Sequence, residues 1–354
     1  MEDRNPQRRG RVRSPLAPLV RANFVVVVMA TAVIAVVSLV AEDLLRRIPA
    51  DGDLVIWYRS AVLVGMLGLL LIALRYWGTV HRATGTLFHV QVLDEQERDL
   101  RAAGRAAAER RRMVLRSVTR WVDLAQRTNE QGAVELADVC RDVSDILEAQ
   151  VNADQIDTGY TLAPAMAWPV AIAIGAQLPL PGTLRLLELP DGDGDPSSLI
   201  ELDHAARPVV VECLTFGSWT PNGRIGVWIA AAPDAQELEP KRWAGLGVTS
   251  AFRITLDPGL PDDPVLSDED VAGLGAAIAR ELVVIKRRHR DRELVVVATM
   301  TTIVALATGC YLTQQECRFF HGTHLMHYDR DSDTYLPLRV KEAQPHHAPR
   351  AVGA

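Results

Sequence analysis

ELVVVATMTTIVALATGCYLTQQECRFFHGTHLMHYDRDSDTYLPLRV, residues Glu293–Val340, is the stretch of this 354-residue chain that decides its fold class. It begins with Leu294–Ala298, a valine-rich apolar run bounded by charge, which is typical of a buried strand. An apolar segment that ends near Gly309 or Leu312 then predicts a helix. After a polar turn, two more strands are predicted at Thr323–Tyr328 and Tyr335–Val340. This order of elements indicates an α/β fold.

A hydroxyl-rich turn joins the first predicted strand to the helix, and it consists of Thr299, Met300, Thr301 and Thr302. Amides at the start of a helix are unpaired and carry partial positive charge, so such a turn can bind a phosphate or a nucleotide. The same geometry is also the ordinary way in which an α/β fold turns a corner, and many such turns bind nothing. The turn is therefore a candidate ligand site, and a purely structural turn is the alternative.

Composition allows one or two domains with accessory segments. Hydrophobic residues make up 48% of the chain and charged residues 23%, which excludes both a disordered chain and an all-membrane one. The net charge of −6 does not indicate binding to a DNA or RNA duplex. The four cysteines follow no disulfide framework, so a reducing compartment is expected.

Two apolar segments near the N-terminus predict a transmembrane hairpin. Ala22–Ala41 carries no charged side chain over twenty residues, which as a helix spans about 30 Å, the thickness of a bilayer's hydrocarbon core. Ser60–Leu74 is shorter, but interfacial aromatic residues and arginines flank it on both sides. The connection between the two is brief, so the two spans form a hairpin, and a cleaved signal peptide is the less favoured alternative for the first segment.

Arginines predict the orientation of this hairpin. Six arginines precede the first span, whereas the loop has only Arg46 and Arg47 beside four acids. The positive-inside rule therefore places both termini in the cytoplasm. Neither span contains an acid, a histidine or a proline-broken helix, so a transporter is not indicated. The hairpin is predicted to be an anchor or a simple pore-forming element.

Residues 79–157 predict a helical connector, apart from a possible short strand at Gly85–Leu93. Its first helix is indicated by apolar residues at helical spacing, namely Val114, Val118, Trp121 and Ala125. Its second helix carries a stripe formed by Leu136, Cys140, Val143 and Leu147. The connector is either an oligomerising stalk or a pair of helices packed on the globular domain. The predicted domains are 1–21 (basic cytoplasmic N-terminus), 22–78 (hairpin), 79–157 (connector), 158–341 (α/β domain) and 342–354 (disordered tail).

An internal comparison favours two related half-units. Ala165–Leu178, predicted to be a buried helix, matches Thr299–Leu312 at six of fourteen positions. The matched pairs are Met166/Met300, Val170/Val304, Ala171/Ala305, Ala173/Ala307, Gly175/Gly309 and Leu178/Leu312. Both segments are followed by a turn and an apolar strand, so a ligand site between or beside two half-units is expected. Accidental similarity between two alanine-rich helices is the alternative.

Catalytic and metal motifs are weak. The chain contains no GxSxG, HExxH or P-loop motif, so it is predicted not to be an enzyme. Four zinc-type residues lie within eleven positions near Cys310, namely Cys317, His321, His324 and His327. Strand alternation places the last two on opposite faces, and there is no paired CxxC. We therefore predict ordinary histidines, with no metal and no other cofactor.

The segment Tyr160–Val340 resembles a SAVED domain, a cyclic-oligonucleotide sensor built from two fused CARF-like Rossmann units. The resemblance is carried by the first strand, the helix with Ala305 and Gly309, the strand ending THLMHYD and the closing YLPLRV. The strand start VVVATMTT departs from the family's usual acidic or proline-containing version. Two spans followed by such a domain resemble the membrane effectors of CBASS anti-phage systems.

This resemblance implies a cyclic di- or trinucleotide ligand, a homo-oligomer and damage to the bacterial inner membrane, with the lipid bilayer as a second partner. Together with the helix-terminus argument, it makes Thr299, Met300, Thr301 and Thr302 the expected ligand cradle. Pseudo-symmetry adds Ala165, Met166 and Trp168, with Trp168 able to stack on a base. Tyr328 and Arg330 are further candidates. The alternative function is a membrane-anchored scaffold or adaptor whose α/β domain binds a protein partner.

Overall fold

The computed structural model describes residues 24, 26–28, 30, 31, 34, 38, 64–76, 85–94, 99–154, 160–178, 184–189, 199–202, 209–215, 223–231, 240–256, 268–314, 318–329 and 332–349. The chain divides into two units. One consists of Met1–Thr86 with Ala108–Val114, and the other of Leu87–Ala107 with Leu115–Ala354. The second unit holds almost all of both β-sheets and is the body of the protein.

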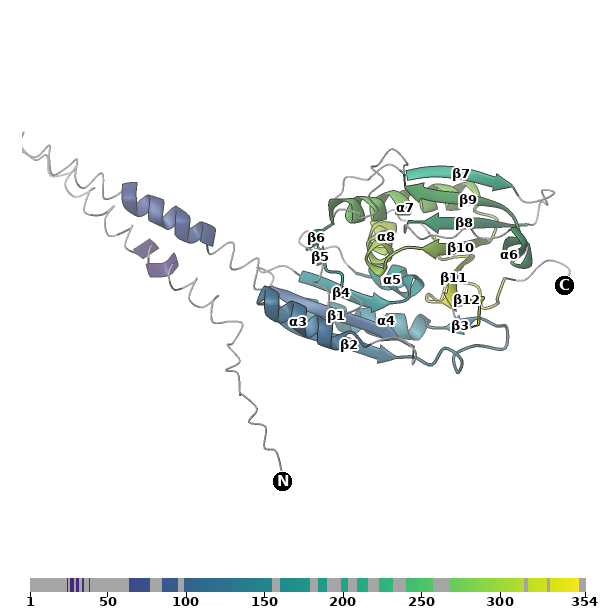
Figure 1. Ribbon diagram of the computed structural model, residues 1–354, viewed down its shortest axis with the longest axis horizontal. Coiled ribbons are helices and arrows are strands. Elements are labelled where there is room, and N and C mark those ends of the chain that lie inside the picture. The colour runs from purple at the N-terminus through teal and green to yellow at the C-terminus, as the bar shows by residue number, and fades with distance from the viewer. Residues whose placement is uncertain are drawn as a thin grey trace, which may run out of the picture. The chain divides into compact units, whose positions relative to one another are not determined.

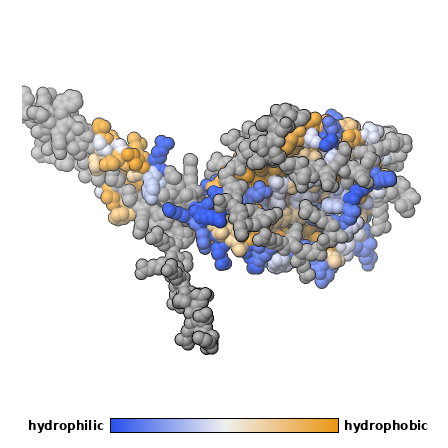
Figure 2. All heavy atoms as spheres, viewed as in Figure 1, coloured by the Kyte–Doolittle hydropathy of each residue, from blue (hydrophilic) through white to orange (hydrophobic). Residues whose placement is uncertain are grey.

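In the first unit, residues 64–76 form a helix most of whose apolar side chains are exposed, with Leu71 at 68% and Ile72 at 67% (Figure 2). This helix covers most of the predicted span Ser60–Leu74. The predicted span Ala22–Ala41 lies mainly outside the described residues, and the eight of its positions that are described are helical. Within the described part of the chain, no helix has both the length and the apolar content needed to cross a bilayer. The predicted basic segment 1–21 is outside the described residues.

The smaller sheet has the strand order β2-β1-β4-β5-β6 (Figure 1). Its central strands β1 and β4 are buried along their whole length, as a sheet covered on both faces requires. β4 and β5 are parallel, and β6 returns antiparallel to β5. The bounds are β1 Thr86–Leu93, β2 Val114–Trp121, β4 Tyr160–Met166, β5 Leu184–Leu186 and β6 Ile200–Glu201.

The larger sheet has the order β3-β12-β11-β10-β8-β9-β7, and its centre is parallel. β10 is the valine-rich strand of the opening sequence stretch, and its first four residues are buried. β12 is antiparallel to β11 and pairs in parallel with β3. The bounds are β3 Val134–Glu135, β7 Val209–Thr215, β8 Arg224–Ala230, β9 Val248–Leu256, β10 Leu294–Thr299, β11 Thr323–Asp329 and β12 Thr334–Arg339.

Helices α5 and α8 lie side by side between the two sheets (Figure 1). Both are apolar on every face and almost completely buried, which is why neither shows an amphipathic pattern. Together with residues from both sheets they form the main hydrophobic core. The described helices of the body are α3 Arg101–Arg111, α4 Ala137–Asn152, α5 Trp168–Gly175, α6 Pro240–Gly245, α7 Asp268–Arg288 and α8 Thr302–Gln314.

The order of elements repeats along the chain. The first series is β1-α3-β2-α4-β4-α5-β5-β6, with the short β3 inserted before α4, and the second is β8-α6-β9-α7-β10-α8-β11-β12. The sheet order β2-β1-β4-β5-β6 corresponds to β9-β8-β10-β11-β12. The α/β fold with two related half-units is therefore present, and each half-unit is larger than the internal comparison indicated.

The first helix predicted within the connector of residues 79–157 is wrong over Val114–Trp121, although helix α3 lies just before it at Arg101–Arg111. Val114–Trp121 is strand β2, and the expected strand at Gly85–Leu93 is β1. Residues four apart share a face in a strand as well as in a helix, so the spacing of Val114 and Val118 fits both. The β-branched residues here favour a strand. The second predicted helix is confirmed as α4, which buries Cys140, Val143 and Leu147.

The buried helix predicted over Ala165–Leu178 begins later than expected. Tyr160–Met166 is strand β4, and α5 begins at Trp168 with Pro169 in its first turn. Proline is tolerated at this position because the first amides of a helix have no partner within it, and its ring restricts the residue before it. Apolar periodicity could not separate a buried strand from a buried helix here.

The tail predicted to be disordered over 342–354 is ordered as far as residue 349, beyond which it lies outside the described residues. Gln344 is only 3% exposed. Its Oε1 accepts hydrogen bonds from the amides of Val340 at 2.7 Å and Lys341 at 2.9 Å, and its Nε2 donates to the Thr323 carbonyl at 3.0 Å. A buried side chain with these bonds fastens the segment to the larger sheet, which composition alone did not reveal.

Lys341 gives a prediction about stability and pH. Burial lowers the pKa of its ammonium from 10.5 to about 8. Between pH 8 and 10.5 the unfolded chain binds more protons than the folded protein, so the free energy of unfolding rises with pH. At pH 7 Lys341 is charged in both states, and the folded protein carries the full cost of burying the ammonium. Lys341→Met is expected to stabilise the protein by about 1 kcal/mol at pH 7, an advantage that shrinks between pH 8 and 10.5. Urea unfolding across this pH range measures it, with the exposed Lys241→Met as control. Equal urea midpoints for Lys341→Met and the wild-type protein at pH 7 would contradict the prediction.

Candidate functional site

The two strand-to-helix turns predicted to be twins meet in the structure. In one, β10 ends at Thr299 and α8 begins at Thr302; in the other, β4 ends at Met166 and α5 begins at Trp168. The hydroxyl of Thr302 donates a hydrogen bond of 3.1 Å to the Met166 carbonyl. The Thr301 hydroxyl accepts a bond of 3.4 Å from the Val304 amide, which makes Thr301 the N-cap of α8. Each of the two hydroxyls therefore makes a hydrogen bond within the protein.

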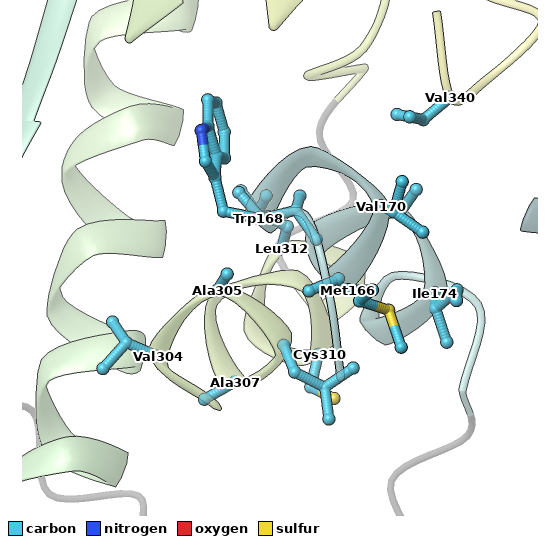
Figure 3. Close-up of a cluster of buried hydrophobic side chains, with 14 of the residues drawn as sticks. Met166, Trp168, Val170, Ile174, Val304, Ala305, Ala307, Cys310, Leu312 and Val340 are labelled. Carbon is cyan, nitrogen blue, oxygen red and sulfur yellow. The ribbon is translucent and has the colours of Figure 1, made fainter. Parts of the chain in front are cut away.

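The helices behind these turns cross at two equivalent glycines. A Cβ on Gly175 would lie less than 3.0 Å from the Leu306 carbonyl, and a Cβ on Gly309 would meet the Ile172 carbonyl in the same way. Ile172 and Leu306 correspond to each other in the internal alignment, so the two contacts are related by a local two-fold axis. The Thr313 hydroxyl adds a bond of 2.7 Å to the Ala176 carbonyl. Figure 3 shows this helix pair.

Met166 and Trp168 are core residues in this conformation. Their exposed fractions are 6% and 7%, and they belong to the same buried cluster as Val304 and Ala305 (Figure 3). The prediction that the Trp168 indole is open to stack on a base is therefore not met here, because the apolar surroundings of the helix pair bury it. Ala165 is also buried. By contrast, the four residues Thr299, Met300, Thr301 and Thr302 are all partly exposed.

The threonine turn lies at the point of the larger sheet where the order in which successive strands are added reverses. The Ala231 amide donates a bond of 2.9 Å to the Thr299 carbonyl, so β8 and β10 end beside each other. From β8 the chain continues through α6 to β9 on one side, whereas from β10 it continues through α8 to β11 on the other. Ligands of open α/β sheets bind outside the carboxyl ends of the strands at such a switch point. The sequence did not place the end of β8 at the candidate site, because only the order of strands in the sheet shows that β8 lies beside β10.

Tyr328 lies on the other face of the larger sheet. It shares a face of β11 with Met326, which packs with Trp228 and Val297 in a second cluster away from α5 and α8. Its hydroxyl donates a bond of 2.6 Å to Asp333, and this bond raises the pKa of Tyr328 and lowers that of Asp333. The structure therefore does not bring Tyr328 to the helix-pair face where the twin turns meet. The candidate Arg330 lies outside the described residues.

The Arg242 guanidinium joins Tyr328 at this second position. It lies 5.8 Å from the centre of the Tyr328 ring and 5.9 Å from that of Tyr335, and it bonds Asp333 at 3.1 Å. These residues form a partly exposed cluster on α6 and the β11–β12 hairpin. Arg242 was not identified from the sequence, because it lies far from Tyr328 in the chain and no local sequence pattern links the two residues.

The histidine and cysteine group considered for zinc does not assemble as a unit. Cys310 is buried in α8, where burial raises the pKa of its thiol to about 12 and keeps it protonated. His321 is exposed and Cys317 lies outside the described residues. His324 and His327 belong to strand β11, with the alternation expected of a strand. His324 instead joins residues from other parts of the chain, as described below.

The fold defines an α/β protein with two related half-units, in which the turn at the switch point of the larger sheet meets the equivalent turn after β4 of the smaller sheet. No protein-family profile matches the chain, and no curated protein matches it by sequence. Among solved structures it is similar to Cap4 SAVED/CARF-domain containing receptors.

One is the Acinetobacter baumannii receptor with the cyclic trinucleotide 2'3'3'-cAAA, at 10% identity and a TM-score of 0.41 over 80% of this chain and 56% of the receptor. The same receptor with 3'3'3'-cAAA matches at 12% identity and 0.41, over 77% of this chain and 55% of the receptor. The Moraxella osloensis receptor matches at 8% identity and a TM-score of 0.35, over 92% of this chain and 77% of the receptor. This chain thus spans about half the length of the first two receptors. At these scores, any proposal about function rests on this chain's own residues.

Proposed function

We propose that the body of this protein is a sensor that binds a cyclic oligonucleotide at the paired turns. The observation that carries the proposal is the hydrogen bond between Thr302 and the Met166 carbonyl, which joins two related strand-to-helix turns, one after β10 of the larger sheet and the other after β4 of the smaller sheet. A ligand built from repeated nucleotide units suits a site built from repeated protein units. The role proposed is binding and not catalysis.

The threonine turn supplies the chemistry for a phosphate. The first amides of α8 point out of the helix, and the helix dipole favours negative charge there. Thr299, Thr301 and Thr302 flank this helix start, and all three residues are partly exposed. Met300, between them, offers an adaptable apolar surface for a base. Met166 and Trp168 would take part only after a shift of the α5 turn, since both are buried in this conformation.

We further propose that the protein is a membrane effector. Residues 22–41 and 60–74 would form the anchor in the bacterial inner membrane, with both termini in the cytoplasm, because of their apolar length and the arginines before the first segment. Ligand binding would drive the assembly of several copies and thereby disturb the bilayer. These steps depend on the sequence pattern and on the SAVED-like order of parts.

Calorimetry with the full-length protein and a panel of cyclic di- and trinucleotides tests the proposal. Cyclic triadenylates are the first ligands to try, because similar receptors were solved with them. We expect at least one ligand to bind with a dissociation constant in the micromolar range or below, which corresponds to about −8 kcal/mol. A matched linear oligonucleotide serves as control and should bind more weakly. A silent panel would exclude the sensor, and a stable protein complex in a pull-down would then favour the adaptor.

A further inference from the structure

Three ligand-type side chains meet at the end of the larger sheet opposite to the threonine turn. Glu293 directly precedes β10, His324 is the second residue of β11, and His347 belongs to the ordered C-terminal segment. One nitrogen or oxygen atom from each lies within 4.8 Å of the other two. His324 is buried, Glu293 is partly buried and His347 is exposed.

The spacing of these atoms fits a shared ion. The Glu293 Oε2 atom is 3.3 Å from His324 Nε2, and its Oε1 atom is 3.3 Å from His347 Nε2. Neighbouring ligand atoms around a tetrahedral zinc ion, with bonds of about 2.0–2.1 Å, are about 3.3–3.4 Å apart. A direct N–H···O hydrogen bond would instead favour about 2.9–3.0 Å. The two contacts involve different oxygens of Glu293, so the carboxylate lies between the two imidazoles, about one tetrahedral ligand–ligand distance from each, and its contact with His324 is a long hydrogen bond.

The surroundings of the cluster hold its ligand atoms in place. The Arg224 Nε atom donates a bond of 2.7 Å to Glu293 Oε2, which fixes the carboxylate and leaves Oε1 directed at His347. Ligating carboxylates are usually oriented by such outer hydrogen bonds. The His324 side chain has an exposed fraction of 2%, so its ring cannot turn away into solvent. The carboxylate and the two imidazoles form a mixed oxygen and nitrogen set, which zinc binds readily.

We propose that Glu293, His324 and His347 bind one divalent transition metal ion, with zinc the best fit, and that a water molecule completes the tetrahedron. The ion fastens the C-terminal segment to the amino end of β10 and β11. Other attachments of this segment include the buried Gln344, the bond from the Ala348 amide to the Gln131 carbonyl at 3.0 Å, and the bond from the Asn129 side-chain amide to the His346 carbonyl at 2.9 Å. This site is separate from the proposed nucleotide site, so either can fail without the other.

The sequence did not reveal this set, because its members come from three separate parts of the chain. The prediction of no metal considered residues close together between Cys310 and His327. His324 was in that group, but its two partners were not. They reach it only because β10 and β11 are adjacent and the tail folds back over their ends.

The test is zinc titration of the chelator-treated, full-length protein by calorimetry and by metal analysis after dialysis. We expect one equivalent of zinc to bind the protein at this site. His347→Ala should weaken this binding at least tenfold, and its exposed position makes misfolding an inadequate explanation. Glu293→Gln should do the same. His321→Ala removes an exposed histidine three residues from His324 and should have no effect.

A second measurement reports on the tail itself. Zinc should slow hydrogen exchange of the amides in residues 341–349 in the wild-type protein and not in His347→Ala. Substituting cobalt for zinc should produce the strong visible absorption of a tetrahedral site, which His347→Ala should abolish. Wild-type protein that binds no zinc would overturn the proposal, with the cluster then a set of ion pairs around Arg224. Zinc binding that His347→Ala leaves unchanged would also overturn it.

Discussion

Gly309→Ala is expected to destabilise the protein by about 3 kcal/mol, although alanine is a far better helix former than glycine. Gly309 lies where α8 crosses α5, and the added Cβ would lie less than 3.0 Å from the Ile172 carbonyl oxygen. The obstacle is backbone, so no side chain can rotate away, and the two helices must separate inside a closely packed core. Chemical unfolding followed by the fluorescence of the buried tryptophans Trp228 and Trp243 measures the loss.

The equivalent change Gly175→Ala should cost a similar amount, because its Cβ would meet the Leu306 carbonyl. The double variant should lose less than the sum of the two single losses, since one separation of the helices relieves both clashes. Gly245→Ala is the control, because a Cβ there would have no neighbour within 4 Å, and its effect should stay within about 0.5 kcal/mol. Strict additivity, or a neutral Gly309→Ala, would contradict the close crossing.

Replacing Thr301 and Thr302 together by alanine is expected to reduce the affinity for the cyclic oligonucleotide by about a hundredfold. The Thr301 hydroxyl accepts a bond from the Val304 amide and keeps its own hydrogen for a charged phosphate, whereas the Thr302 hydroxyl can donate to a phosphate only in exchange for its bond to the Met166 carbonyl. A hydrogen bond to a charged group is worth about 1.5–3 kcal/mol. The structure adds a cost in stability, because Thr301 caps α8 and Thr302 bonds the Met166 carbonyl. That cost should be about 2 kcal/mol in all, so the variant should still fold. Calorimetry and chemical unfolding measure the two effects separately.

The matched control replaces both residues by serine, which keeps the hydroxyls and removes only the methyl groups. It should retain the helix cap and most of the affinity for the ligand. If the serine variant loses binding as fully as the alanine variant, the hydroxyls are not the ligand contacts. If the alanine variant binds normally, the cradle lies elsewhere, and Ala231 at the end of β8 marks the next place to look.

The predicted helical connector shows where sequence reasoning failed and why. Val114 and Val118 are four residues apart, a spacing that strands and helices share, and the sheet that buries Val118 is formed by distant segments. Trp168 was expected to stack on a base because pseudo-symmetry with the threonine turn placed it in the expected ligand cradle. Whether it is buried depends on α5 packing between the two sheets, which no local pattern encodes.

The sequence by itself determined the strand, threonine turn and apolar helix of Leu294–Leu312 and the similarity of this segment to Ala165–Leu178, although not the strand β4 that occupies Tyr160–Met166. These features follow from apolar periodicity, β-branched residues and the matched glycines, all of which act over a few residues. Only the tertiary structure decided that the two turns meet at the Thr302–Met166 bond, and that Glu293 and His324 are joined by a tail predicted to be disordered. These groups come together because of the order of the strands in the sheets and because the C-terminal segment folds back over the larger sheet. Both features depend on how distant segments pack into one core.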